Sequence, residues 1–219
     1  RQALLGALMT ARHRPSLARP PHGLTVIEMM VTVMVLAVIL ALAVPSLRDF
    51  MARQRVKAVN AELVTDLQFA RTEAVARNRE VYVTFRMDDR AGEPPMTCYT
   101  VHTLGTVGGC DCRKPIGTAC DAVPELVELK TVQLLRDTTA TFAAPAWPAN
   151  RVGFSKTRGL SFWNGHDATS ASYVADWVDF PINVESSIAG RLRTSVHITG
   201  RPQVCSPDAS ISGVTRCAE

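Results

Sequence analysis

The sequence predicts an α+β fold in which one long N-terminal helix packs on an antiparallel β-sheet domain. Two observations carry this prediction. Residues 24–79 contain a single proline, Pro45, and no glycine, and their apolar residues recur with helical spacing. From residue 80 onward, short β-branched and aromatic runs alternate with segments rich in glycine, proline and polar residues, which is typical of antiparallel strands joined by turns.

The first half of the predicted helix has the composition of a membrane span. The 21 residues from Leu24 to Val44 hold one charge, Glu28, and this length is about what a bilayer core requires. A carboxylate at that depth costs about 2.5–3.5 kcal/mol, so Glu28 should have a partner. Pro45 removes one backbone donor and should bend the helix near the membrane surface. We therefore expect residues 24–45 to be the transmembrane half.

The second half of the predicted helix, residues 46–79, is amphipathic. Charged residues, including Asp66, should fill its solvent side, while apolar residues spaced by three or four should form one buried face. The two halves together give a helix of roughly 80 Å at about 1.5 Å per residue. The predicted buried face consists of Val56, Val59, Leu63, Leu67, Ala70, Ala74 and Val75.

A β-rich globular domain is expected over residues 80–219. The segment 126–135 fits either a helix or a strand period, and we predict a strand because it lies between turns. The other runs with strand composition are residues 81–85, 98–102, 152–154, 160–163, 177–180 and 195–198.

The first 23 residues carry the whole net charge of the chain. They hold four arginines and no acidic residue, and the chain has a net charge of +4, so the remainder is neutral. Overall basicity is therefore no argument for nucleic-acid binding by the rest. Positive charge beside an apolar helix favours retention in the cytoplasm, which would leave the long C-terminal part across the membrane. A plain N-terminal anchor with a cytoplasmic tail fits these features as well.

Six cysteines lie beyond the apolar segment, and an even count in an exported domain indicates disulfides. We expect Cys205 to pair with Cys217, while the connectivity of the other four cannot be read. Those four should staple a turn-rich insertion at residues 96–121. Free thiols are an alternative, and zinc is disfavoured because two of the cysteines are too closely spaced for a zinc knuckle. The four are Cys98, Cys110, Cys112 and Cys120.

The run from Gly23 to Val31, Gly-Leu-Thr-Val-Ile-Glu-Met-Met-Val, resembles the class III signal of type IV pilins and type II secretion pseudopilins. The resemblance implies that prepilin peptidase cuts between Gly23 and Leu24 and that Leu24 is then N-methylated. It also implies that Glu28 pairs with a mature N-terminus during subunit assembly. The family often has a proline where Pro45 stands. Its first mature residue is most often Phe, so Leu24 is a milder variant.

Two further stretches are similar to one branch of that family, the FimT/GspH minor pilins. Residues 67–74 match its L-x-x-A-R-x-E-A helix, and Thr199-Gly200-Arg201 resembles its C-terminal strand. The resemblance implies a pilin-like minor pilin that helps initiate or cap a type IV pilus, with a minor pseudopilin of a type II secretion system as the alternative. It implies a single-pass protein of the bacterial inner membrane with a periplasmic domain. Its partners would be other pilins and the inner-membrane assembly platform.

Some FimT-type proteins bind DNA during natural transformation through a C-terminal Gly-Arg-x-Arg motif. Aligned on Gly200, this chain has Gln203 in place of the second arginine, and a literal match lies at residues 190–193, where the family pattern places a strand. Phosphate binding needs several cations, and residues 186–219 carry four arginines. A solvated basic edge is the alternative. The four are Arg191, Arg193, Arg201 and Arg216.

Catalysis has little support in the sequence. The histidines beyond residue 23, His102, His166 and His197, stand in strand or turn contexts and in no recognisable nucleophile, metal or phosphate motif. We therefore expect no enzymatic activity, no metal and no cofactor. A monomeric, membrane-anchored binding domain is the remaining alternative of a different class.

Overall fold

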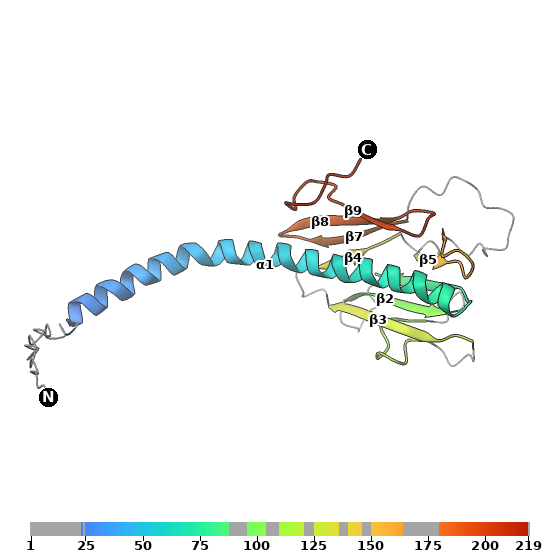
Figure 1. The fold of residues 1–219 in the computed structure, drawn as a ribbon. Coiled ribbons are helices and arrows are strands. Elements are labelled where there is room, and N and C mark those ends of the chain that lie inside the picture. Colours follow the sequence, from blue (N-terminus) through green and yellow to red (C-terminus); the bar gives the residue numbers. More distant parts are fainter. Residues whose placement is uncertain are drawn as a thin grey trace, which may run out of the picture. The chain divides into compact units, whose positions relative to one another are not determined.

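The structure is a computed structural model, and it describes residues 23, 25–87, 96–103, 110–120, 125–135, 140–145, 150–163 and 180–218. The chain divides into two compact units, Arg1–Ala43 and Val44–Glu219. One helix, α1 (Val26–Ala76), contains residues of both units and precedes all the strands in the chain (Figure 1). The leader peptide expected at residues 1–23 lies outside the described residues except for Gly23.

Local signals fix both ends of α1 slightly inside the predicted range of 24–79. At the start, the Thr25 hydroxyl accepts a hydrogen bond from the backbone N–H of Glu28 at 3.3 Å, which is the geometry of a helix N-cap. At the end, Asn78 adopts a left-handed conformation with φ of 51°, and the Arg79 N–H donates to the carbonyl of Ala74 at 3.2 Å. This turn satisfies the last carbonyls and stops the helix.

The strands form two antiparallel sheets, where we expected one. A five-stranded sheet has the order β3-β2-β1-β5-β6, and a four-stranded sheet has the order β4-β7-β8-β9. In the four-stranded sheet, β8 includes residues 195 and 196 of the run predicted at 195–198 and ends there. Strand β3 confirms the strand predicted at 126–135. The strands are β1 (Val81–Arg86), β2 (Met96–Thr103), β3 (Glu128–Leu135), β4 (Thr141–Ala143), β5 (Arg151–Phe154), β6 (Ser161–Trp163), β7 (Phe180–Ser186), β8 (Gly190–Val196) and β9 (Pro202–Cys205).

One apolar core joins both sheets to the second half of α1. Aromatic rings bridge the two sheets: Phe85 of β1 lies 6.0 Å from Phe180 of β7, measured between ring centroids, and 5.4 Å from Tyr99 of β2 in its own sheet. Phe142 of β4 lies 5.1 Å from Tyr99. Each sheet has an apolar face that must be buried. The two sheets and the second half of α1 bury these faces together in one core.

The buried face of α1 matches the prediction at six of seven positions. Val56, Leu63 and Leu67 are fully buried, as are Ala70 and Ala74, and Val59 is nearly so. Two expectations were wrong. Val75 is 49% exposed because it lies beside the buried stripe, and Asp66, expected in solvent, is only 4% exposed.

Asp66 is buried because two strands supply partners for it. Its carboxylate accepts a hydrogen bond from the Tyr99 hydroxyl of β2 at 2.7 Å and another from the Lys130 ammonium of β3 at 2.8 Å. Burial, followed by the neighbouring charge of Asp66, raises the pKa of Tyr99. Burial alone would lower the pKa of Lys130, but its hydrogen bonds to Asp66 and Glu62 outweigh this and raise the pKa.

The cysteine-containing insertion is shorter than the predicted residues 96–121. Residues 96–103 are not part of it, because they form β2, which pairs with β1 on one side and β3 on the other. In β2, buried and exposed residues do not alternate, because almost every residue of this central strand is buried. The described part of the insertion is a turn at residues 110–120, whose ends meet in an antiparallel bridge between Cys110 and Cys120.

The C-terminal tail, residues 206–218, returns to the helix. Ile211 is 1% exposed and belongs to the same core as Val56. Lys57 of α1 donates a hydrogen bond to the carbonyl of Ser212 at 2.9 Å. The tail therefore contributes a side chain to the core, and the Cys205–Cys217 disulfide also ties it to β9.

Candidate assembly site

The candidate assembly site consists of Gly23, the N-cap Thr25 and the first turn of α1, which carries Glu28. Gly23 is exposed, and nothing lies within 4 Å of where a Cβ would stand. Glu28 is also exposed, and it is the third residue of the helix. The predicted mature residue Leu24, and therefore its amino group, lies outside the described residues.

Glu28 also has a local explanation. A threonine at the N-cap followed three residues later by glutamate is the sequence pattern of a capping box, and a carboxylate in the first turn is stabilised by the helix dipole. These effects are worth about 0.3–1 kcal/mol at an exposed helix end. They explain a helix start at Thr25, but they give no reason for the apolar residues that surround Glu28. The threonine and the glutamate of this capping box are visible in the sequence and predict a helix start at Thr25, but our prediction of the helix did not use them.

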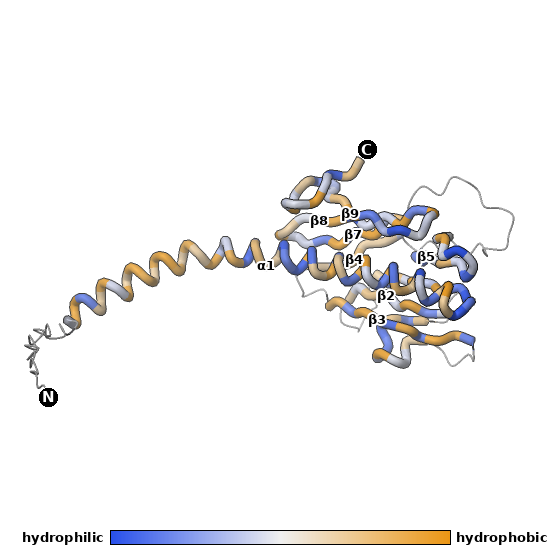
Figure 2. Tube along the Cα trace, viewed as in Figure 1, coloured by the Kyte–Doolittle hydropathy of each residue, from blue (hydrophilic) through white to orange (hydrophobic). Residues whose placement is uncertain are grey.

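The first unit exposes an apolar surface along α1. Apolar side chains between Val26 and Leu42 point outward around the helix, with Val26 at 75% and Met34 at 71% exposure. Figure 2 shows this stretch as an almost continuous hydrophobic tube. Of the helices that the structure describes, α1 alone is long and apolar enough to cross a membrane. An apolar surface of this extent needs lipid or other apolar helices to cover it.

Pro45 lies inside α1, as predicted. The boundary between the two compact units falls between Ala43 and Val44, one residue before this proline. A proline within a helix removes one intrahelical hydrogen bond and clashes with the preceding turn. The bend expected at Pro45 stays a prediction.

Two of the four C-terminal arginines lie on the outer face of the four-stranded sheet. Arg191 and Arg193 alternate along β8 with Leu192, which is buried, so both arginine side chains point away from the core. The register places Glu185 of β7 opposite Arg191, and an Asp208 oxygen lies 3.9 Å from its Nε. The positive charge of Arg191 is therefore partly compensated.

The other two arginines lie elsewhere. Arg201 is exposed and directly precedes β9, in the turn after β8, and Arg216 is exposed on the tail. The hydrogen bond from the Ser210 hydroxyl, together with further bonds from Ser210 and Ser206, lowers the pKa of Asp208, so an acidic group lies in the same tail. The expected C-terminal strand begins at Pro202, because Thr199 and Gly200 form a turn.

The two stretches that resemble FimT/GspH proteins meet in space. Arg71, from the L-x-x-A-R-x-E-A helix, donates a hydrogen bond from Nε to the carbonyl of Gly159 at 3.0 Å. Gly200, from the Thr-Gly-Arg stretch, has φ of 71°, and a Cβ there would stand 2.3 Å from the same carbonyl oxygen and 3.1 Å from Arg71 Nε. The glycine of this motif therefore has a packing role that needs no ligand.

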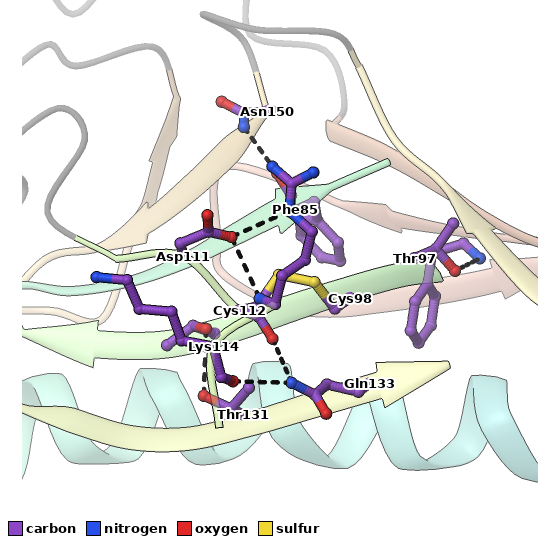
Figure 3. The surroundings of a disulfide bond; sticks show 12 residues. Phe85, Thr97, Cys98, Asp111, Cys112, Lys114, Thr131, Gln133 and Asn150 are labelled. Atoms are coloured by element: carbon purple, nitrogen blue, oxygen red, sulfur yellow. Dashed lines mark hydrogen bonds and ion pairs between the residues drawn. A yellow bond between two sulfur atoms is a disulfide. The ribbon is translucent and has the colours of Figure 1, made fainter. Parts of the chain in front are cut away.

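All six cysteines are paired. Cys205 is bonded to Cys217, as expected, and the remaining pairs are Cys98–Cys112 and Cys110–Cys120. Figure 3 shows the Cys98–Cys112 disulfide, which ties β2 to the insertion. Among the described residues, no group of three or more histidines, cysteines or acidic residues could hold a metal ion.

Two side chains hold the stapled insertion against β3. Gln133 donates hydrogen bonds to the carbonyls of Cys112 at 2.6 Å and Lys114 at 2.9 Å (Figure 3). The Glu128 carboxylate accepts bonds from the backbone N–H groups of Gly117 at 2.9 Å and Ala119 at 2.8 Å. Partial burial alone would raise the pKa of Glu128, but the hydrogen bonds from Thr131, Gly117 and Ala119 outweigh it and lower the pKa.

A second carboxylate shapes the insertion from within. The backbone N–H and the Nε of Arg113 both lie 3.2 Å from one oxygen of Asp111. Burial would raise the pKa of Asp111, but the hydrogen bonds and charge of Arg113, aided by the charge of Arg86, lower it. The insertion is therefore a built, covalently closed feature of the fold.

The histidines occupy structural positions where the structure describes them. His102 of β2 is 2% exposed, and its Nε2 lies 2.9 Å from the Thr84 hydroxyl of β1. His197 directly follows β8, and its carbonyl accepts hydrogen bonds from Gly200 N–H at 2.7 Å and from the Ser161 hydroxyl at 2.5 Å. His166 lies outside the described residues.

Comparison with known proteins decides the family. Residues 60–174, more than half of the chain, match the family model described as type II transport protein GspH. The chain belongs to the GspH family. Residues 19–44 match a second model, the prokaryotic N-terminal methylation motif, which contains Gly23, Leu24 and Glu28. The resemblance to FimT/GspH minor pilins and pseudopilins is thereby confirmed.

Solved structures of pilin-like proteins are similar to this GspH-family chain. The type IV minor pilin FimU of Pseudomonas aeruginosa is 16% identical, with a TM-score of 0.44, over 71% of this chain and 91% of FimU. The minor pseudopilin EpsH of the Vibrio cholerae type 2 secretion system is 11% identical, with a TM-score of 0.42, over 69% of this chain and 97% of EpsH. No curated protein matches the chain. The GspH match ends at residue 174, so the four C-terminal arginines lie beyond it.

Proposed function

We propose that this GspH-family chain is a minor pilin of a type IV pilus and helps to initiate or cap the filament. The observation that carries the proposal is the exposed apolar helix of residues 26–44 with its one carboxylate, Glu28, within the methylation-motif match. In this role the chain is structural and has no catalytic part. Other pilins, and the inner-membrane assembly platform, are its partners.

Cleavage by prepilin peptidase gives Glu28 its partner. The cut between Gly23 and Leu24 creates an ammonium group four residues before Glu28, which is about one helical turn. A carboxylate buried among apolar helices costs about 2.5–3.5 kcal/mol unless it is paired. Pairing Glu28 with the N-terminus of its own or a neighbouring subunit compensates this cost and sets the axial position of the incoming helix.

The proposed location is the bacterial inner membrane, with a single pass and the globular unit in the periplasm. The apolar part of α1 has the length of a span, and the basic leader fits retention on the cytoplasmic side. The three disulfides of the second unit fit an oxidising compartment.

A second candidate is a minor pseudopilin of a type II secretion system. The description of the matching family, type II transport protein, favours it. Both candidates use the same helix, the same cleavage and the same Glu28, so the site itself is common to them.

Deletion and complementation in the source bacterium test the proposal and separate the two candidates. We expect the deletion to remove surface pili and leave protein secretion intact, with the wild-type gene restoring piliation. Glu28→Ala should be cleaved normally but be absent from sheared filaments, whereas Asp49→Ala, an exposed carboxylate of the same helix, should be incorporated. Loss of secretion with normal pili would favour the pseudopilin, and filaments containing Glu28→Ala would contradict the assembly role of Glu28.

Contact with DNA through Arg191, Arg193, Arg201 and Arg216 stays a prediction. A gel shift with the detergent-solubilised chain tests it, because phosphate contacts weaken steeply as salt rises. If the arginines bind DNA, replacing all four by alanine should abolish a shift seen at low salt. The absence of any shift at low salt would remove this prediction.

A further inference from the structure

We propose that the native disulfides of this chain require a thiol–disulfide isomerase as a folding partner. The inference starts from the order of the cysteines. Cys98 pairs with Cys112 and Cys110 pairs with Cys120, so the two bonds cross along the chain. It rests on the proposed function only in placing the second unit in an oxidising compartment.

Pairing of neighbours in the sequence would give different bonds. A chain that emerges N-terminus first and is oxidised as it emerges would join Cys98 to Cys110 and Cys112 to Cys120. These consecutive bonds span 12 and 8 residues, and the native bonds span 14 and 10, so the consecutive set closes the shorter loops in total. Since the entropic cost of closure grows with loop length, chain entropy does not favour the native pairs.

The cysteines at 110 and 112 are separated by one residue, Asp111. Their two thiols are therefore nearly equally close to any third cysteine that approaches this part of the chain. Selection of Cys112 by Cys98, and of Cys110 by Cys120, must come from the folded surroundings of the insertion.

Several residues that hold the insertion in place follow the four cysteines in the sequence. Gln133, which binds the carbonyls of Cys112 and Lys114, and Glu128, which binds the N–H groups of Gly117 and Ala119, both belong to β3. Cys98 itself lies opposite Gln133 in the register of β2 and β3. All four cysteines precede β3 in the chain, so the consecutive bonds can form before the native surroundings exist.

Local structure in the insertion does not replace these contacts. The Asp111 N–H donates to the carbonyl of Ala119 at 2.6 Å, and the Lys114 N–H donates to the carbonyl of Asp111 at 3.0 Å, which brings Cys110 toward Cys120. An isolated two-stranded hairpin is at best marginally stable in water. The turn alone therefore does not prevent Cys112 from capturing Cys120.

Three thiol–disulfide exchanges convert the consecutive bonds into the native ones. An isomerase thiolate attacks the Cys98 sulfur, forms a mixed disulfide and releases the Cys110 thiolate. The Cys110 thiolate then attacks Cys120 and releases the Cys112 thiolate. The Cys112 thiolate attacks Cys98 and releases the enzyme. The number of disulfides is unchanged and no net electrons are transferred, so the step needs an isomerase and no further oxidant.

The experiment compares disulfide pairing in two bacterial strains. The full chain is expressed in strains with and without their exported disulfide isomerase, the thiol oxidase being intact in both. Free thiols are blocked, and unreduced peptides are mapped by mass spectrometry after cleavage at Asp111, which separates Cys110 from Cys112. We expect loss of the isomerase to lower the fraction of native Cys98–Cys112 severalfold and to produce Cys98–Cys110 and Cys112–Cys120 peptides.

Two controls make the comparison specific. Cys205–Cys217 joins neighbours in the sequence, so it should form equally in both strains. The double variant Cys98→Ala, Cys112→Ala keeps only consecutive pairs, and its Cys110–Cys120 bond should not depend on the isomerase. Full native pairing of the wild-type chain without isomerase would overturn the inference alone. Reduced cysteines in both strains would contradict the proposed export and, with it, the inference.

Discussion

At the scale of single residues, Asp66 shows how the strands decide what the helix buries. Among the described residues it is the one buried carboxylate. A charge removed from water needs hydrogen-bonded partners, and Tyr99 and Lys130 supply them from two different strands. This pair of contacts fixes the position of α1 along β2 and β3.

Replacing Asp66 by alanine should destabilise the fold strongly. The change leaves the buried Tyr99 hydroxyl without its acceptor, and an unsatisfied buried polar group costs about 1–3 kcal/mol. The matched control is Glu62→Ala, because Glu62 also binds Lys130 but its side chain is 48% exposed, and an exposed pair is worth about 0–1 kcal/mol. Urea unfolding of the full chain in detergent measures both, and equal losses would contradict the role of Asp66.

Acid should loosen the stapled insertion through Glu128. The folded-state pKa of Glu128 is lowered, so its contribution to stability is present above its unfolded-state pKa and is lost as the pH falls through the folded-state value. We expect the amides of Gly117 and Ala119 to exchange faster with solvent as the pH drops below about 4, since the ordinary glutamate pKa is about 4.3.

Hydrogen exchange read by mass spectrometry measures this effect, after correction for the intrinsic pH dependence of exchange. Glu128→Gln should flatten the pH dependence of exchange at these two amides. Asp111, whose pKa is also lowered, should still respond to acid in this variant. Unchanged pH dependence in Glu128→Gln would contradict the assignment.

Some site residues could be recognised in the sequence and others could not. Gly23, Glu28 and Pro45 are recognisable because their spacing along an apolar run resembles that of the class III signal. The burial of Asp66 could not be predicted, because its partners lie 33 and 64 residues away in the sequence. Nor could the crossed cysteine pairs, whose selection depends on β3.

At the scale of elements, a junction joins the end of α1 to the two sheets. Arg71 of the helix, the turn containing Gly159 between β5 and β6, and the turn containing Gly200 between β8 and β9 are in direct contact. The Ser161 N–H of β6 also donates to the carbonyl of Ile198 at 3.0 Å, which links β6 to the turn after β8.

Gly200→Ala should break this junction. A Cβ at Gly200 would meet the Gly159 carbonyl oxygen at 2.3 Å, and the positive φ adds strain of about 1–3 kcal/mol. Gly213→Ala is the matched control, because Gly213 also has a positive φ but nothing within 4 Å of a Cβ. Thermal unfolding should show a clearly larger loss for Gly200→Ala, and equal losses would show that the contact is unimportant.

The elements were predictable to the extent that their periodicity is local. The helix and the strands near residues 81–85, 98–102 and 126–135 follow from period and composition. Most of β7, β8 and β9 did not, because Pro181, Gly190 and Pro202 interrupt or begin them. The division into two sheets depends on pairings between distant strands, which periodicity does not encode.

At the scale of the whole molecule, the two units impose opposite requirements. The second unit buries its apolar residues in one core and closes its loops with three disulfides. The first unit leaves its apolar residues exposed along α1. The apolar surface of α1 is removed from water only when lipid or other subunits cover it, which agrees with membership of the GspH family.

The N-terminus of the mature protein tests the central claim most directly. The chain is purified from the membrane and from sheared filaments of its source bacterium, and its N-terminal peptide is sequenced by mass spectrometry. We predict that this peptide begins at Leu24, carries one methyl group on the α-amine, and retains no part of residues 1–23. A chain that keeps its arginine-rich leader in the membrane would contradict the claim, because Glu28 would then lack the partner on which assembly depends.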